Sequence, residues 1–156
     1  MTDLQAHPFS TFNFAVEIAL DGDARPLVDA AFSDCDGLEM TQEVKTIREG
    51  GSNDRQIRLP GPVAFGQLTL KRGMTADFGL WDWFNRSIAD PTLRASAEIV
   101  LLAQDGHTMR ARFQLTRCLP VKIKAPALSA RDGAIAIEEL QVAYETLKLG
   151  PLGSFA

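Results

Sequence analysis

Few residues of this sequence have side chains that bind metals or carry out nucleophilic catalysis. The two cysteines, Cys35 and Cys118, are not spaced like a metal-binding knuckle, and neither has a histidine at ligand spacing. The two histidines, His7 and His107, lie in a predicted terminal tail and a predicted hairpin turn, where we expect solvated side chains. These patterns predict no bound metal, no cofactor and no nucleophile paired with a base.

Paired carboxylates would offer acid–base chemistry, but no such pair is expected on one face of a strand. Glu138 and Glu139 are adjacent, and neighbouring residues of a strand point to opposite faces, so these carboxylates do not converge on one substrate. Asp34-x-Asp36-Gly37 matches only the start of a calcium loop, and Gly61-x-x-x-x-Gly66 is not followed by the lysine of a phosphate-binding loop. A hydrolase is therefore disfavoured, and we expect a protein that is not an enzyme.

The dominant pattern in the chain is the alternation of apolar and polar residues, which is typical of strands with one buried face. It recurs in residues 12–20, 97–102, 109–116, 121–124 and 135–149. The alternation slips by one residue beside Gly66 and again at Glu138 and Glu139, where we expect β-bulges. We predict a single domain over residues 1–156 that is mainly β, with two packed antiparallel sheets in a barrel-like sandwich, one flanking helix and a projecting hairpin.

One helix is predicted over residues 78–89, with Asp77 as its N-cap. Its apolar residues recur at helical spacing, so one stripe of the helix should pack on a sheet. The expected core residues are Leu80, Phe84 and Ile88. Trp83 is two residues from Trp81, so the two side chains cannot both face the core, and we expect Trp83 at the margin of the stripe near a neighbouring subunit.

Residues 38–59 are predicted to form a projecting hairpin arm. The segment is extended in character but has no continuous apolar face, so it cannot pack wholly on a core. Gly50 and Gly51 are the expected hinge or tip, and Pro60-Gly61-Pro62 is expected to break the chain after the arm. Such an arm is ordered best by another subunit, through strand addition and complementary charge. The residues assigned to this contact are Glu43, Lys45, Arg48, Glu49, Gly50, Gly51, Arg55 and Arg58.

The charge and hydropathy of the chain disfavour several other functions. A net charge of -4 at pH 7 is unlike that of a dedicated nucleic-acid binder, and Lys71-Arg72 is too short a basic cluster for a nucleic-acid patch. No apolar run approaches the ~18 residues of a membrane-spanning helix, and the first residues lack the pattern of a secretory signal. We therefore expect assembly in the cytoplasm without a membrane anchor.

Several short motifs follow one another along most of the chain. They are Phe12-x-Phe14-x-Val16, Phe32-Ser33-Asp34-x-x-Gly37-Leu38, Arg48-Glu49-Gly50-Gly51, Leu59-Pro60-Gly61, Leu68-Thr69-Leu70-Lys71-Arg72-Gly73, Leu80-Trp81-Asp82-Trp83, Pro120-Val121-Lys122 and Ala136-Ile137-Glu138-Glu139-Leu140. In order and spacing, from residue 12 to residue 148, this set resembles the phage tail-like tube proteins. These proteins form the inner tube of contractile injection systems and contractile phage tails.

The resemblance implies a structural subunit that forms rings of six, with the rings stacked into a hollow tube. A contractile sheath would surround the tube and drive it through a target envelope. Baseplate or hub proteins and a cap would lie at its ends, and cargo or a tape-measure protein would fill its lumen. The arm would bridge to an adjacent ring, and the whole would be part of a phage tail or a released injection particle. Candidate subunit contacts are Trp83, Lys71, Arg72, Glu138 and Glu139.

A small-ligand-binding β-barrel is the main alternative. Alternating strands fit such a barrel equally well, but the charged arm of residues 38–59 does not. A stable ligand-bound monomer would support the barrel, whereas a hexamer or a polymer would support the tube subunit.

Overall fold

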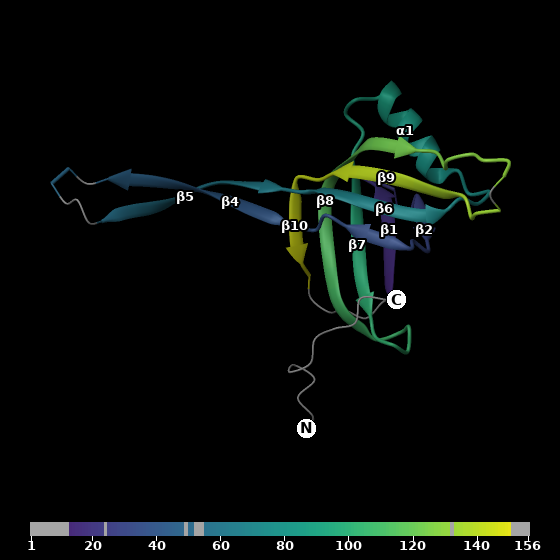
Figure 1. Cartoon of the computed structure of the whole chain (residues 1–156), viewed down its shortest axis with the longest axis horizontal. Helices are drawn as coiled ribbons and strands as arrows, with labels where there is room; N and C mark the ends of the chain where they lie inside the picture. The colour runs from purple at the N-terminus through teal and green to yellow at the C-terminus, as the bar shows by residue number, and fades with distance from the viewer. Residues whose placement is uncertain (1–12, 24, 49, 52–54, 132, 151–156) are drawn as a thin grey trace.

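The body of the protein consists of two antiparallel β-layers whose strands run in different directions (Figure 1). The computed structural model describes residues 13–150 except 24, 49, 52–54 and 132. The elements are β1 (Phe14–Leu20), β2 (Val28–Ala30), β3 (Asp34–Asp36), β4 (Met40–Arg48), β5 (Gln56–Phe65), β6 (Gln67–Gly73), α1 (Gly79–Ala89), β7 (Ala95–Leu102), β8 (Met109–Lys124), β9 (Ile137–Ala143) and β10 (Thr146–Leu149). The strands of the body are ordered β2-β1-β7-β8-β9-β6-β3 with β10 beside β8, while β4 and β5 form a separate hairpin.

Strand β8 belongs to both layers and makes the corner between them. Its first half pairs with β7 and β10 in the first layer, which consists of β2, β1, β7, β8 and β10. Its second half pairs with β9 in the second layer, which consists of β8, β9, β6 and β3. At the change of layer Arg117 is an extra residue in the β7–β8 register, with a positive φ of 51°, and Val121 is an extra residue opposite β9. Such bulges bend a strand. The two separate strands expected over 109–116 and 121–124 are therefore one bent strand.

The core fills the space between the two layers, and the alternation seen in the sequence identifies its strands correctly. In β1, for example, Val16, Ile18 and Leu20 are buried, and the residues between them are only half-buried. The buried cluster consists of Val16, Ile18, Leu20, Phe32, Leu68, Leu70, Leu80, Trp83, Ala95, Ala97, Ile99, Leu115, Cys118, Leu140, Val142, Tyr144 and Leu147. The predicted class, two packed antiparallel sheets with one helix, is confirmed.

The two bulges predicted from slips in the alternation are corrected by the structure. Pairing of β6 with β9 is continuous through Glu138 and Glu139, and the residue facing the core is Glu138, which is 1% exposed, rather than Ile137, which is 43% exposed. The slip therefore marks a buried charge. The slip beside Gly66 marks the boundary between β5 and β6. A Cβ at Gly66 would lie 2.9 Å from the backbone carbonyl oxygen of Gly37, so the close approach of the two backbones there favours glycine.

A buried polar cluster joins the second layer to the start of α1. Arg72 donates through Nε to one carboxylate oxygen of Glu138, and Nε1 of Trp81 donates to the other at 2.9 Å. Nη2 of Arg72 also donates to the carbonyl oxygen of Asp77 at 2.9 Å. The carboxylate of Asp77 accepts the N–H of Gly79 at 3.1 Å. The N-cap residue itself is Phe78, so the prediction of Asp77 as N-cap is wrong by one residue. Buried charges are tolerated when they are paired and hydrogen-bonded in this way.

The helix buries a different stripe from the one predicted. Leu80 is buried as expected, but Ile88 is 68% exposed and Trp83 is completely buried, so the placement of Trp83 at an outer margin is wrong. Residues three apart share one helix face, so Trp83 lies beside Leu80 toward the core. Trp81 lies to the side, where its N–H reaches Glu138.

Tyr144 holds the root of the projecting hairpin against the body. Its hydroxyl donates to the carbonyl oxygen of Gly37 at 2.7 Å and accepts the N–H of Glu39 at 3.1 Å. Its ring lies 5.8 Å from that of Phe65, centroid to centroid. Because Glu39 precedes β4 and Phe65 ends β5, one side chain contacts both strands where they leave the body.

We predict that Glu138→Leu lowers the free energy of unfolding by about 3–5 kcal/mol, because it leaves the Arg72 charge buried without its partner. Glu139→Leu on the same strand is the matched control and should change the stability by under about 1 kcal/mol. Urea unfolding followed by tryptophan fluorescence measures both. Equal losses in the two variants would contradict the assignment of Glu138 to the core.

Tyr144→Phe should loosen the arm root while leaving the body folded. The change removes both hydroxyl contacts and leaves the N–H of Glu39 without that acceptor, a local cost of about 1–3 kcal/mol. We expect faster hydrogen exchange in residues 37–42 and unchanged exchange in β1 and β7. Thr146→Val, which removes a hydroxyl paired with Thr116, is the control and should leave the arm root protected.

Candidate assembly interface

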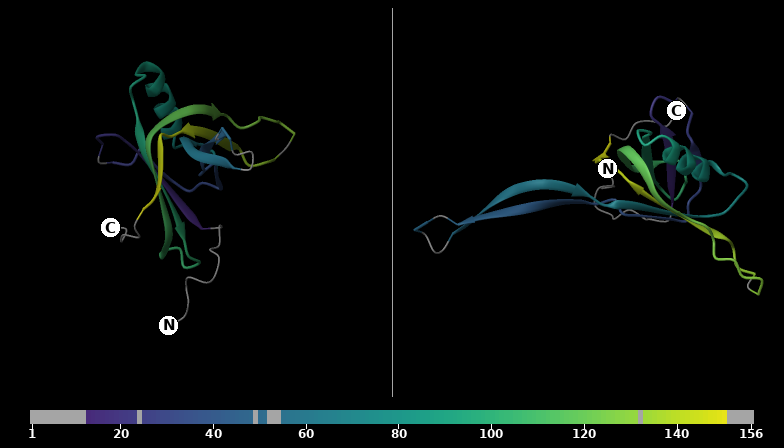
Figure 2. Two further views of the ribbon diagram at one scale, coloured as in Figure 1. Left: turned by 90° about the vertical axis from the view of Figure 1, so that its left-hand side faces the viewer. Right: turned by 90° about the horizontal axis from the view of Figure 1, so that it is seen from above.

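The hairpin of β4 and β5 projects from the body and pairs with no other strand in the described part of the chain (Figure 1, Figure 2). This arm covers residues 40–65, so the predicted boundaries of 38–59 are corrected. Pro60-Gly61-Pro62 does not end the arm, because Gly61 and Pro62 together face Glu43 in a bulge. A Cβ at Gly61 would lie 2.9 Å from the carbonyl oxygen of Glu43, which explains the glycine.

The outer half of the arm has an apolar face, contrary to the sequence-based expectation. Ile47 lies opposite Ile57 and Lys45 lies opposite Leu59, which places these four residues on one face of the hairpin. The exposed fractions of the three apolar residues are 47% for Ile47, 39% for Ile57 and 41% for Leu59. We call these three residues the arm patch. The opposite face carries Val44, Thr46, Arg48, Gln56, Arg58 and Pro60.

The charged residues assigned to the arm are available to a partner. Those that the structure describes are all exposed, and none of them takes part in an ion pair with another described residue. Gly50 and Gly51 lie at the tip, where Gly51 has a φ of 109° that favours glycine. Glu49 lies outside the described residues. The exposed charged residues are Glu43, Lys45, Arg48, Arg55 and Arg58.

Three of the five candidate subunit contacts on the body are corrected by the structure. Trp83 is completely buried, and Arg72 and Glu138 are 2% and 1% exposed, so none of them can meet a neighbour without unfolding. Lys71 and Glu139 lie on the outer face of the same strands and are accessible. Neighbouring residues of a strand point to opposite faces, so Arg72 and Glu138 are buried while Lys71 and Glu139, which are adjacent to them in sequence, are accessible.

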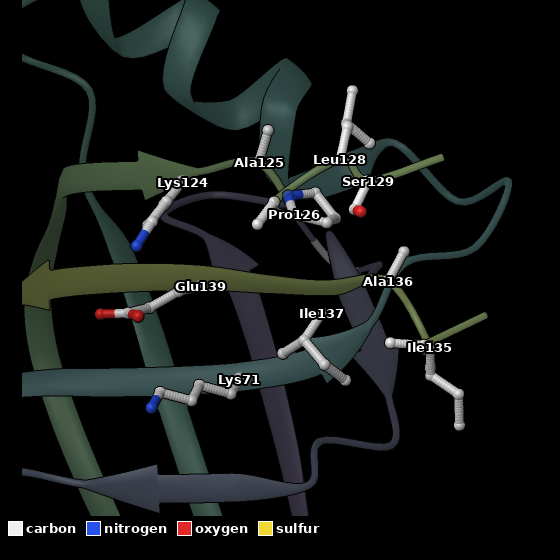
Figure 3. A pocket seen from close by; sticks show the side chains of 12 residues that line it. Lys71, Lys124, Ala125, Pro126, Leu128, Ser129, Ile135, Ala136, Ile137 and Glu139 are labelled. Carbon is white, nitrogen blue, oxygen red and sulfur yellow. The ribbon is translucent and has the colours of Figure 1, made fainter. Parts of the chain in front are cut away.

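The accessible pair belongs to a row of alternating charges. Glu139 lies between Lys71 and Lys124 in the registers of β6, β9 and β8 (Figure 3). The row borders a groove that also contains Leu128 and Ile135, whose exposed fractions are 92% and 80%. This groove is a second exposed surface of the body, and it lies away from the arm.

The cysteines have the properties of unreactive core thiols. Burial raises the pKa of the Cys35 thiol to about 11 and that of the Cys118 thiol to about 12. Both thiols are therefore protonated at neutral pH, a state that is neither a nucleophile nor a metal ligand. Within the described residues, no three His, Cys, Asp or Glu side chains are grouped to hold a metal. No helix in this part of the chain is long and apolar enough to cross a membrane.

Solved structures with the same architecture include a chain of a contractile injection system. A chain of the anti-feeding prophage baseplate has 28% identity and a TM-score of 0.82, over 94% of this chain and 98% of that one. A chain of the PVC sheath-tube complex, an extracellular contractile injection system, has 18% identity and a TM-score of 0.80, over 96% and 98%. Hcp1 from Flavobacterium johnsoniae shares the fold at 13% identity and a TM-score of 0.52, over 90% and 98%.

The sequence itself matches one family over most of its length. No match was found among curated proteins. The profile of the T4-like virus tail tube protein gp19 matches residues 10–148, which include the arm, the helix and both layers. The chain therefore belongs to the family of T4-like virus tail tube proteins and is a structural tube subunit.

Proposed function

We propose that this chain forms homohexameric rings that stack into the hollow inner tube of a contractile injection system. The observation that carries the proposal is the arm, which exposes apolar and charged side chains and has no strand partner in the described subunit. Rings of six are supported by the similar chain of the anti-feeding prophage baseplate, whose structure was symmetrised six-fold. The family match favours a protein without catalytic activity and disfavours the small-ligand-binding barrel.

Unpaired strand edges support ring closure. Among the described strands, β2 pairs only with β1, and β10 pairs only with β8. The first layer therefore ends on both sides in backbone N–H and C=O groups without a strand partner. Pairing of these edges between neighbouring subunits satisfies the backbone groups and removes edges that promote aggregation.

The partners of such a tube are a contractile sheath, baseplate or hub proteins, a terminal cap, and cargo or a tape-measure protein in the lumen. Chains with this fold occur in the PVC sheath-tube complex and in the anti-feeding prophage baseplate and cap, which supports the first three. Lys71 and Glu139 are proposed as contacts on the body. Subunits assemble in the cytoplasm and then become part of a phage tail or a released injection particle.

Electron microscopy of the purified protein should show rings with six-fold symmetry and a central channel. Light scattering coupled to size-exclusion chromatography should give the mass of six chains or a multiple of it, with one chain contributing 17.0 kDa. Discrete monomers across a wide range of protein and salt concentrations would refute the proposal.

Replacing residues 46–56 with a short Gly-Ser turn should preserve the body and the single ring but abolish stacking into tubes. The reason is that the arm is proposed to bridge adjacent rings, and the body packs without it. High salt should likewise loosen stacking of the unmodified protein before it disrupts rings, because exposed charge pairs are screened. Long tubes formed by the shortened protein would show that the arm does not join the rings.

A further inference from the structure

An apolar cleft of about 500 Å³ opens between the two layers beside β3. Its apolar lining is Phe14, Cys35, Leu38, Ile99, Leu101 and Phe113. Five of these six side chains are only half-buried, and Ile99 alone is buried. In Figure 1 the strands β7 and β8 continue past the second layer, so this part of the first layer has no strand above it. Apolar surface of this kind is stabilised when a partner covers it.

The strand above the cleft has an unpaired edge with an apolar side and an acidic side. In the described chain β3 pairs only with β6. Ser33, Asp34 and Cys35 all line the cleft. Alternation along the strand places Asp34 and Asp36 on the opposite face from Cys35, and both are exposed, so Asp34 lies at the mouth of the cleft. The hydroxyl of Ser33 donates to Asp34 at 3.0 Å and the N–H of Gly37 donates to Asp36 at 2.8 Å, and no described residue forms an ion pair with either carboxylate.

The outer half of the arm is complementary to the edge of β3 in its apolar face, in its basic face and in its unpaired backbone groups. The arm patch lies on one face, with Lys45 at its end nearer the body, and the two arginines Arg48 and Arg58 lie on the other face. Beside β3, the apolar face would cover the cleft and the basic face would lie on the side of Asp34 and Asp36. The outer edges of the hairpin also have backbone groups without a strand partner, so pairing with β3 satisfies groups on both sides.

The arm that fills the cleft must come from another copy. Each arm projects away from its own body, and Tyr144 fixes the direction in which it leaves (Figure 1). We propose that the arm of a neighbouring copy adds to β3 as a further strand of the second layer, with the arm patch in the cleft. This inference rests on the proposed tube function and assigns the surface that receives the arm. Because each copy supplies one arm and one cleft, the contact is head-to-tail and repeats from subunit to subunit.

Exchange of one charge pair tests the contact. Asp34→Arg and Arg58→Asp should each raise the protein concentration needed for tube formation several-fold, because each places like charges across the contact. The double variant should return this concentration close to that of the unmodified protein. Asp34 also lies opposite Lys71 within the subunit, so thermal unfolding of each variant shows that the body is intact. Arg131→Asp, in the exposed loop between β8 and β9, is the control and should have no effect.

Covalent cross-linking tests which face of the arm meets the acidic side of β3. A chain with Cys35→Ala, Asp34→Cys and Arg58→Cys should give covalent oligomers with a short bismaleimide once tubes have formed. The matched chain with Ile57→Cys in place of Arg58→Cys places the second thiol on the opposite face and should give few. Equal cross-linking of the two chains, or none in either, would overturn the assignment.

The outcome separates this inference from the proposed function. If the shortened arm abolishes stacking but the exchanged charges show no rescue and the cross-link is absent, the arm joins rings through another surface. In that case the inference is wrong and the proposed function stands. If the shortened arm has no effect on stacking, the inference is wrong because the arm does not join the rings, whereas the proposed tube is refuted only if the unmodified protein forms no rings or tubes.

Discussion

The hydroxyl group of Tyr144 is the interaction on which the geometry of the arm depends. The hairpin of β4 and β5 has no other strand to align it within the described subunit, so its direction is set at its root. The hydroxyl fixes that root by donating to the carbonyl oxygen of Gly37 and accepting the N–H of Glu39, and the ring adds a contact with Phe65. Because the hairpin is long and attached at one end, its tip occupies the same position relative to the body in every copy only if the root is rigid. Repetition of one contact through an assembly requires that uniformity.

The Arg72–Glu138 pair fixes the position of the helix α1 on the body, as Tyr144 fixes the direction of the arm. A buried ion pair adds little net stability compared with apolar residues of the same volume, because desolvation offsets the attraction between the charges. The pair does restrict the packing of α1, since Trp81 and the carbonyl oxygen of Asp77 bind to the same two side chains. Movement of the helix along the layer would leave a buried charge without a partner. The cluster therefore favours one arrangement of helix and sheet over neighbouring ones.

Local patterns in the sequence were sufficient for the strands, the helix and the existence of an arm. Alternation identified the buried face of β1 because that periodicity belongs to a single strand. Features that depend on a partner strand were missed or misplaced. The slip at Glu138 resembled a bulge because the buried partner, Arg72, lies on another strand. The arm patch was overlooked because Ile47 meets Ile57 only when the hairpin is paired in its actual register. Tyr144 gave no local signal, because its role depends on a turn about a hundred positions earlier in the chain.

The Pro60-Gly61-Pro62 bulge has a consequence for the subunit before it assembles. Proline has no N–H, so over this stretch β5 lacks the donors that another strand would need for a continuous ladder. Exposed hairpins with an unbroken edge are templates for fibril growth, and a proline within the edge interrupts that growth. The β5 edge of an unassembled subunit is therefore a poor template for such growth. On the tip side of this interruption β5 keeps an unbroken run of donors, Gln56–Leu59, in the half of the arm that carries the arm patch.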